Sequence, residues 1–179
     1  DPTTPGEVGL VEGVNGKGVI RSLSNFAAPL ATASRVVMPT ELVVKSADGY
    51  PVHGWVFVPE GEGPHPVLLN IHGGPHADYT WGWFDEVQVL AGAGYAVVQC
   101  NPRGSAGYGR EHGTAIREQM GTLDFQDVIA FLEGSLKAEK SLDKKRLGIM
   151  GGSYGGYLTA WTIAHDHRFA TAVVERGYL

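Results

Sequence analysis

The stretch Gly151-Gly152-Ser153-Tyr154-Gly155-Gly156 constrains the fold of this chain more than any other. The short apolar run 146–150 before it predicts a strand, and residues 157–164 after it predict a buried helix. Glycine suits positions 151 and 155 of a strained turn, because a Cβ there would meet the neighbouring strand or helix. The sequence therefore predicts a strand, a sharp turn and a helix in succession, with Ser153 at the turn.

Strand, turn and helix are the context in which Gly-x-Ser-x-Gly forms a nucleophile elbow. Such an elbow exposes Ser153 Oγ above the sheet and leaves the Tyr154 backbone N–H at a helix N-terminus, where it can stabilise an oxyanion. One alternative is a glycine turn with an incidental serine. Another is a phosphate-binding loop, but the Gly-x-Gly-x-x-Gly spacing fails and Gly-Lys-[Ser/Thr] does not occur. We therefore expect Ser153 to be a catalytic nucleophile.

Apolar runs alternate with helical patterns along most of the chain. Residues 41–45 and 52–58 predict a hairpin around Asp48-Gly49. Further strands are expected at 67–71, 95–100, 146–150 and 171–174, and helices at 83–91, at 114–119 and from Asp124 onward. Alternating strands and helices imply βαβ units. The expected fold class is therefore α/β, with a mostly parallel sheet and helices on both faces.

Composition narrows the functional classes. The chain has 179 residues, of which 43% are apolar and 18% charged, as in globular domains. A net charge of −5 argues against nucleic acid or an anionic membrane as a partner. The sequence shows no membrane-spanning run and no secretory signal pattern, so we expect a cytoplasmic location. The single Cys100 excludes an internal disulfide, and the missing initiator Met suggests an internal or processed piece.

A second glycine motif, His72-Gly73-Gly74-Pro75-His76, follows the strand expected at 67–71. This is the position at which α/β-hydrolases keep their second oxyanion element. The Gly74 N–H is therefore the candidate partner of the Tyr154 N–H. A tight turn at the end of a strand is the alternative.

Three motifs in this order resemble the prolyl oligopeptidase family of serine peptidases, in particular the acylaminoacyl-peptidase branch. They are residues 72–76, the segment Asn-Pro-Arg-Gly-Ser-Ala-Gly-Tyr-Gly at 101–109, and residues 151–157. The resemblance covers about residues 40–179. It implies an α/β-hydrolase domain at 39–179 that is incomplete in this chain. Residues 1–38 would be a linker or the end of an N-terminal β-propeller.

The same resemblance assigns roles to individual residues. Ser153 matches the nucleophile, and Tyr154 and Gly74 match the oxyanion donors. Active-site loops are expected to contain His72, Gly73, Arg103 and Tyr108. For Arg103 itself, a structural salt bridge or a hydrogen bond to backbone is expected in preference to a catalytic role.

No residue of this chain fits the role of general base. In α/β-hydrolases an acid and then a histidine follow the serine. His165 and His167 are expected at the far end of the helix after the elbow, on the order of 15–20 Å from Ser153. His72 and His76 precede the serine, so either one would break the chain order. The triad acid and histidine are therefore expected outside this chain, which would be a fragment with an exposed strand edge.

The leading expectation is a serine peptidase that cleaves short peptides, releasing N-terminal acyl-amino acids or residues through an acyl-enzyme on Ser153. A carboxylesterase or lipase on the same scaffold is one alternative, and a catalytically inert fragment of a larger enzyme is another. The chemistry needs no metal or organic cofactor. The expected partners are a short peptide substrate and the remainder of the same enzyme, and homo-oligomerisation stays open.

Overall fold

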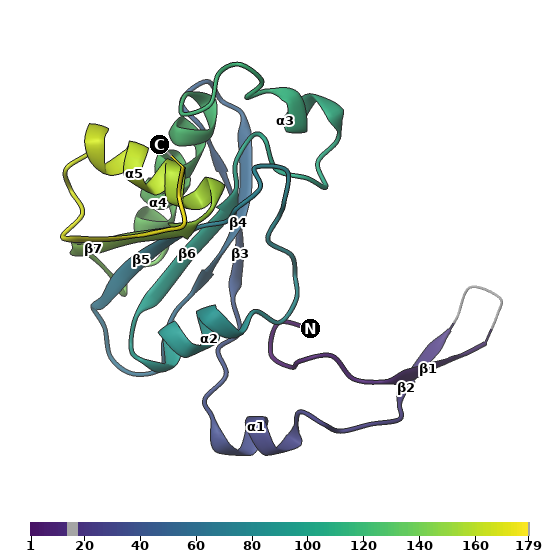
Figure 1. Ribbon diagram of the computed structural model, residues 1–179. Coiled ribbons are helices and arrows are strands. Elements are labelled where there is room, and N and C mark those ends of the chain that lie inside the picture. The colour runs from purple at the N-terminus through teal and green to yellow at the C-terminus, as the bar shows by residue number, and fades with distance from the viewer. Residues whose placement is uncertain (14–17, 179) are drawn as a thin grey trace.

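The computed structural model describes residues 1–13 and 18–178, and six of its strands form one sheet in the order β3-β4-β6-β5-β7-β8 (Figure 1). These strands are β3 (Thr40–Lys45), β4 (Pro51–Phe57), β5 (His65–Ile71), β6 (Ala96–Asn101), β7 (Leu142–Gly152) and β8 (Thr171–Glu175). Strand β4 is antiparallel to β3 and to β6, while β6, β5, β7 and β8 run parallel. The expected mostly parallel α/β sheet is confirmed.

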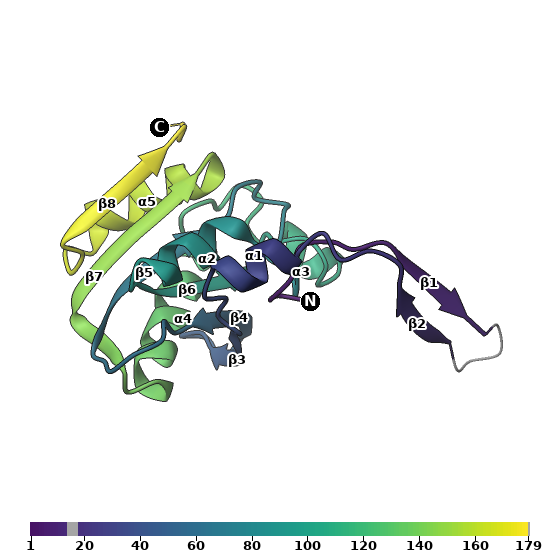
Figure 2. The ribbon, with the colours of Figure 1, turned by 90° about the horizontal axis from the view of Figure 1, so that it is seen from below.

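Helices cover both faces of this sheet. Helices α4 (Leu123–Ala138) and α5 (Tyr154–His165) lie on one face, and α2 (Asp85–Gly92) lies on the other (Figures 1 and 2). The short α3 (Arg110–Thr114) follows the loop after β6. Within residues 1–13 and 18–178, no helix combines the length and the apolar character that a membrane crossing requires.

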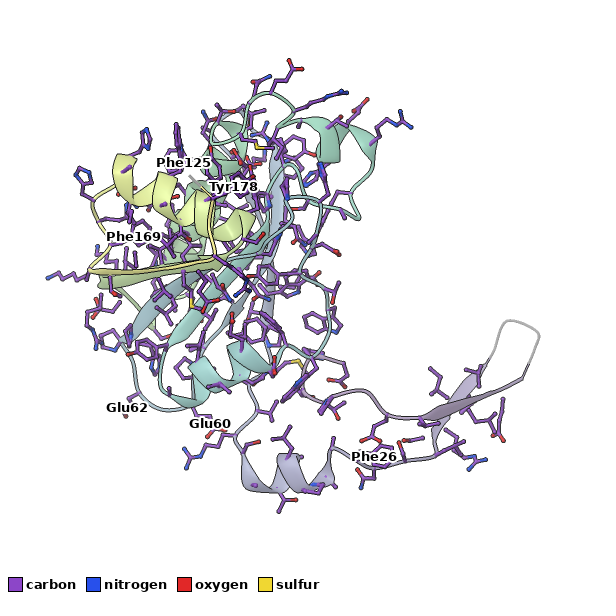
Figure 3. All side chains as sticks on the ribbon, in the orientation of Figure 1. Phe26, Glu60, Glu62, Phe125, Phe169 and Tyr178 are labelled. Carbon is purple, nitrogen blue, oxygen red and sulfur yellow. The ribbon has the colours of Figure 1, made fainter. Side chains whose placement is uncertain are left out.

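Alternating side chains of the strands supply two hydrophobic cores. In β6, Val98 joins the core under α4 and α5, whereas its neighbour Val97 faces α2. Phe131 of α4 is fully buried in the larger core. Phe125 and Phe169 pack against that core from the side of α5 (Figure 3). Because both faces of β5 and β6 are covered, their runs are continuously apolar rather than alternating.

Residues before the sheet form an arm. Strands β1 (Gly9–Glu12) and β2 (Val19–Ser22) pair as an exposed hairpin that projects away from the sheet, and α1 (Ala28–Ala33) lies beside α2 (Figures 1 and 2). The buried Gln88 of α2 anchors this segment: its amide exchanges two hydrogen bonds with the Val37 backbone, at 2.8 and 2.9 Å, and donates to Pro2 O at 3.3 Å. The role of residues 1–38 as a linker or propeller end stays a prediction.

Two helix boundaries differ from the expectation. The helix predicted at 114–119 is wrong: α3 ends at Thr114, and Glu118 has a φ of 60°, which a helix cannot contain. The helix predicted from residue 83 begins only at Asp85, because Phe84 is extended, with φ −136° and ψ 106°. Strand β8 is one of the two edge strands of the sheet and is exposed along its whole length, in agreement with the expected exposed strand edge.

Two helical glycines provide a test of the packing between α4 and β3. An added Cβ on Gly134 would lie 2.5 Å from both methyl groups of Val44, whereas one on Gly92 in α2 would meet nothing within 4 Å. We expect Gly134→Ala to lower the free energy of unfolding by about 1–3 kcal/mol through overpacking. Gly92→Ala, the matched control, should raise it by up to about 1 kcal/mol through helix propensity. Denaturant titration measures both, and a stabilised Gly134→Ala would contradict this packing.

Candidate active site

Ser153 occupies a strained turn between β7 and α5. Its backbone has φ 59° and ψ −120°, a conformation that residues other than glycine rarely adopt. Such strain costs on the order of 1–3 kcal/mol and persists only where the surroundings enforce it. The side chain is exposed, and its Oγ forms no hydrogen bond with any residue in the described ranges 1–13 and 18–178. The predicted strand, sharp turn and helix are confirmed.

Glycines allow α5 to lie directly on the backbone of β5. A Cβ on Gly155 would be 2.0 Å from Ile71 O, and one on Gly151 would be 2.7 Å from the same oxygen. Strand β8 supports the turn from the other side, because the Ser153 N–H donates to Glu175 O at 3.0 Å. The strain at Ser153 is thus imposed by both neighbouring strands.

Tyr154 is held by the carboxylate of Asp124, which lies in the first turn of α4. The hydroxyl of Tyr154 donates to Asp124 Oδ2, and the same oxygen accepts the Gly121 N–H at 3.2 Å. Asp124 is fully buried, and burial together with this hydrogen bond raises the pKa of Tyr154. The start of α4 therefore anchors the first residue of α5, whose N–H is the candidate oxyanion donor. The sequence carries no signal for this contact, because it depends on how α4 packs against α5.

The oxyanion loop, defined here as residues 72–76, lies against the elbow. A Cβ on Gly73 would be 3.3 Å from Ser153 Cβ and 3.1 Å from Gly152 O. Gly74 has a φ of 120°, and a Cβ there would be 2.6 Å from the backbone nitrogens of His76 and Ala77, so only glycine fits. Across the described residues, the Gly74 N–H donates no hydrogen bond within the chain. The structure brings Gly73 and Ser153 together, while the donor role of Gly74 stays a prediction.

The histidines considered for the general base form hydrogen bonds with groups other than Ser153. His72 Nδ1 lies 2.7 Å from Gly73 O and its Nε2 lies 2.9 Å from Ser105 Oγ, so neither ring nitrogen is free for Ser153. Burial lowers the pKa of His72, which favours the neutral ring. His76 Nδ1 is bonded to Gly104 O at 2.8 Å. His165 caps the far end of α5 with its Nδ1 on Trp161 O at 2.7 Å.

The arginine loop, defined here as residues 103–109, is fixed by two ion pairs of Arg103, a buried one with Asp127 and a partly exposed one with Asp48. The Arg103 guanidinium contacts Asp127 at 2.6 and 2.8 Å and Asp48 at 2.5 and 3.3 Å, and lies over the Tyr50 ring at 4.6 Å. These hydrogen bonds, that to Asp127 first, raise the pKa of Arg103, while Arg103 lowers that of Asp48. The expected structural salt bridge of Arg103 is confirmed.

Tyr108, the other predicted residue of this loop, lies beside His53. Its hydroxyl accepts from Asn101 Nδ2 at 2.8 Å and lies 2.5 Å from His53 Nδ1. His53 in turn contacts Glu41 at 2.6 Å. Burial is the main cause that raises the pKa of Tyr108. These contacts tie the loop to the hairpin of β3 and β4.

A cavity of about 330 Å³ opens beside Ser153 at the ends of β5, β7 and β8. Its wall combines the aromatic Tyr79, Trp83 and Phe84 with the charged side chains Asp78, Glu86, Glu175 and Arg176. On its floor, Asn70 Nδ2 donates to Glu86 Oε1 at 2.8 Å. The nucleophile candidate therefore borders a space with room for a further side chain or a substrate group.

Ser153 is an exposed serine on a strained strand-to-helix turn, and the glycine loop that follows the neighbouring strand lies against it. This arrangement defines an α/β-hydrolase-type site. A family comparison agrees: residues 81–179, more than half of the chain, match the model of the "Prolyl oligopeptidase family", Peptidase_S9. The chain belongs to this family of peptidases.

Individual relatives show the same similarity. The chain is 46% identical over 145 residues to "Uncharacterized peptidase YuxL" of Bacillus subtilis, covering 79% of this chain and 22% of that protein. It superimposes on Pyrococcus horikoshii acylaminoacyl peptidase with a TM-score of 0.89 and 34% identity, over 99% of this chain and 28% of that chain. A Mycobacterium tuberculosis puromycin-hydrolyzing peptidase matches with a TM-score of 0.80 and 30% identity, over 96% of this chain and 27% of that chain. The chain thus spans about a quarter of the length of these relatives.

Gly155→Ala tests the close approach of α5 to β5. The added methyl group would force the elbow away from Ile71, and we expect the free energy of unfolding to fall by about 2–3 kcal/mol. Gly113→Ala, in α3 and with its nearest contact at 3.7 Å, is the matched control and should change stability little. Thermal denaturation of both variants measures the difference. Equal melting temperatures would show that α5 and β5 do not touch as described.

Proposed function

We propose that Ser153 is the nucleophile of a serine peptidase, with the backbone N–H groups of Tyr154 and Gly74 as its oxyanion donors. The observation that carries this proposal is the strained, exposed Ser153 with Gly73 placed against it. Both N–H groups are main-chain donors on segments that meet at the serine, Tyr154 directly after it and Gly74 directly after Gly73, and such donors suit oxyanion stabilisation. Membership in a peptidase family supports the same chemistry.

In the proposed reaction, Ser153 Oγ attacks the carbonyl carbon of the scissile bond while a histidine takes the hydroxyl proton. The carbonyl oxygen becomes an oxyanion that accepts the two N–H donors. Collapse of the tetrahedral intermediate breaks the C–N bond, and the histidine gives its proton to the leaving amine. A water molecule, whose proton the histidine takes, then attacks the acyl-enzyme. The histidine returns the proton to Ser153 Oγ as the acyl group leaves.

The histidine and its acid are proposed to come from polypeptide outside residues 1–179. Two observations support this. His72 has both ring nitrogens engaged, and His165 lies at the far end of α5. The relatives are several times longer than this chain, which covers 22% of the Bacillus subtilis protein and 28% of the Pyrococcus horikoshii enzyme. The cavity beside Ser153 provides the space through which an imidazole would reach Oγ.

For the substrate we propose short peptides, cleaved to release an N-terminal acyl-amino acid. The similarity to an acylaminoacyl peptidase over 99% of this chain supports this choice. The aromatic wall of the cavity suits an uncharged acyl group or an apolar side chain. A propeller formed by preceding polypeptide is proposed as the element that limits access to short peptides.

A fluorophosphonate probe tests the nucleophile. In the complete polypeptide that carries this segment, the probe should label Ser153, and Ser153→Ala should abolish labelling and lower kcat on the order of 10⁵-fold or more. Ser24→Ala, on the N-terminal arm, is the control and should keep both the labelling of Ser153 and the unaltered kcat. Isolated residues 1–179 should label far more slowly, because no base is in place. Full activity of Ser153→Ala, or equal labelling of the isolated segment, would overturn the corresponding proposal.

Substrate class is tested by comparing an N-acetyl-alanyl anilide, the free alanyl anilide and a simple short-chain ester. A peptidase of the proposed type should have its highest kcat/KM on the acetylated anilide. A preference for the ester by more than about tenfold over both anilides, beyond the gain from a better leaving group, would instead indicate an esterase on the same scaffold.

A further inference from the structure

The oxyanion loop and the arginine loop are joined directly by side-chain hydrogen bonds. They follow β5 and β6, which are parallel neighbours, so both loops begin at the same edge of the sheet. His72 of the first loop lies 2.9 Å from Ser105 Oγ of the second, and His76 Nδ1 lies 2.8 Å from Gly104 O. The position of one loop therefore depends on the other.

The arginine loop is a rigid support for these contacts. Arg103, which is 5% exposed, is fixed by its side chain and its backbone N–H, the latter donating to Asp127 Oδ2 at 2.9 Å. Ser105, two residues further, is only 1% exposed. A buried hydroxyl on a segment held by a buried ion pair has little freedom to move.

The protons in this chain of contacts can be assigned. Gly73 O only accepts, so His72 Nδ1 carries the proton and donates to it. In the neutral ring Nε2 is then an acceptor, and Ser105 Oγ–H is its donor at 2.9 Å. Ser105 Oγ also lies 2.7 Å from Pro102 O, a second acceptor for its one proton. That carbonyl already accepts from the Ser105 N–H at 3.1 Å and from His112 Nε2 at 2.9 Å, so both of its lone pairs are engaged and the hydroxyl proton is left for His72 Nε2. Ser105 therefore fixes the tautomer and the orientation of the His72 ring.

The peptide unit between Gly73 and Gly74 connects the His72 hydrogen bond to the oxyanion donor. The carbonyl of Gly73 and the N–H of Gly74 belong to one planar trans unit and point in opposite directions. A hydrogen bond that fixes Gly73 O consequently fixes the direction of the Gly74 N–H. We propose that Ser105, acting through His72, is a positioning residue that orients the Gly74 oxyanion donor toward the substrate carbonyl. This inference rests on the proposed function.

Ser105→Ala in the complete polypeptide tests the inference. We expect kcat to fall about tenfold or more, because a misdirected oxyanion donor weakens only the transition state, while KM stays within about twofold. The affinity of a peptide aldehyde, which forms an oxyanion on Ser153, should fall by a similar factor. Ser135→Ala is the matched control: Ser135 is fully buried and donates to Phe131 O at 2.8 Å, but lies in α4 away from both loops. It should leave kcat and aldehyde affinity unchanged.

Variants of His72 provide a second, independent test of the positioning role of Ser105. His72→Asn keeps a short amide N–H donor for Gly73 O, whereas His72→Ala removes it, so Asn should retain the higher kcat. In the His72→Ala background, Ser105→Ala should cause no further loss, because the two residues act in series. Fully additive losses would overturn the proposal.

Two controls keep the outcomes distinct. If Ser105→Ala fails to fold, as judged by its melting temperature, the near-isosteric Ser105→Cys, a weak donor, replaces it and should still lower kcat. An unchanged kcat in a folded Ser105 variant, with Ser153→Ala inactive, would refute the positioning role alone. An active Ser153→Ala would refute the proposed function and this inference together.

Discussion

The first turn of α5 lies so close to the end of β5 that a Cβ on Gly155 would be 2.0 Å from Ile71 O. This backbone-to-backbone contact fixes the angle at which the chain leaves β7, and that angle forces Ser153 to a φ of 59°. It also places the turn beside Gly73, because Gly73 comes two residues after Ile71. This contact sets the proximity of Gly73, and together with the hydrogen bond from the Ser153 N–H to Glu175 O of β8 it accounts for the strain at the serine.

Buried polar groups add specificity to this backbone arrangement. Arg103 and Asp127 are both almost completely buried, so their charges gain little net stability after desolvation, but removing one partner would leave the other uncompensated. The pair joins α4 to the arginine loop, and Asp124, one turn earlier in the same helix, joins α4 to Tyr154. A single helix on one face of the sheet thereby contacts both the arginine loop and Tyr154, the residue directly after Ser153.

The elements with strong local signals were predictable. The continuous apolar runs of β5 and β6 correctly indicated strands covered on both faces, and the spacing in α4 indicated a buried helical stripe. The position of α3 was not predictable, because the left-handed backbone of Glu118 has no compositional signal. The contact of His72 with Ser105 was also invisible in the sequence, since it depends on β5 and β6 being neighbours in the sheet order. The donor role of Gly74 stays a prediction.

The oxyanion donors proposed for this site are main-chain groups, which every amino acid except proline provides. A substitution at Gly74 would change the shape of the loop rather than delete the donor, and φ 120° leaves little choice of residue there. The side chains that touch the loop from outside, such as Ser105, can instead be exchanged without removing either donor. The reactivity of a site built from main-chain donors can therefore be adjusted by residues that never contact the substrate.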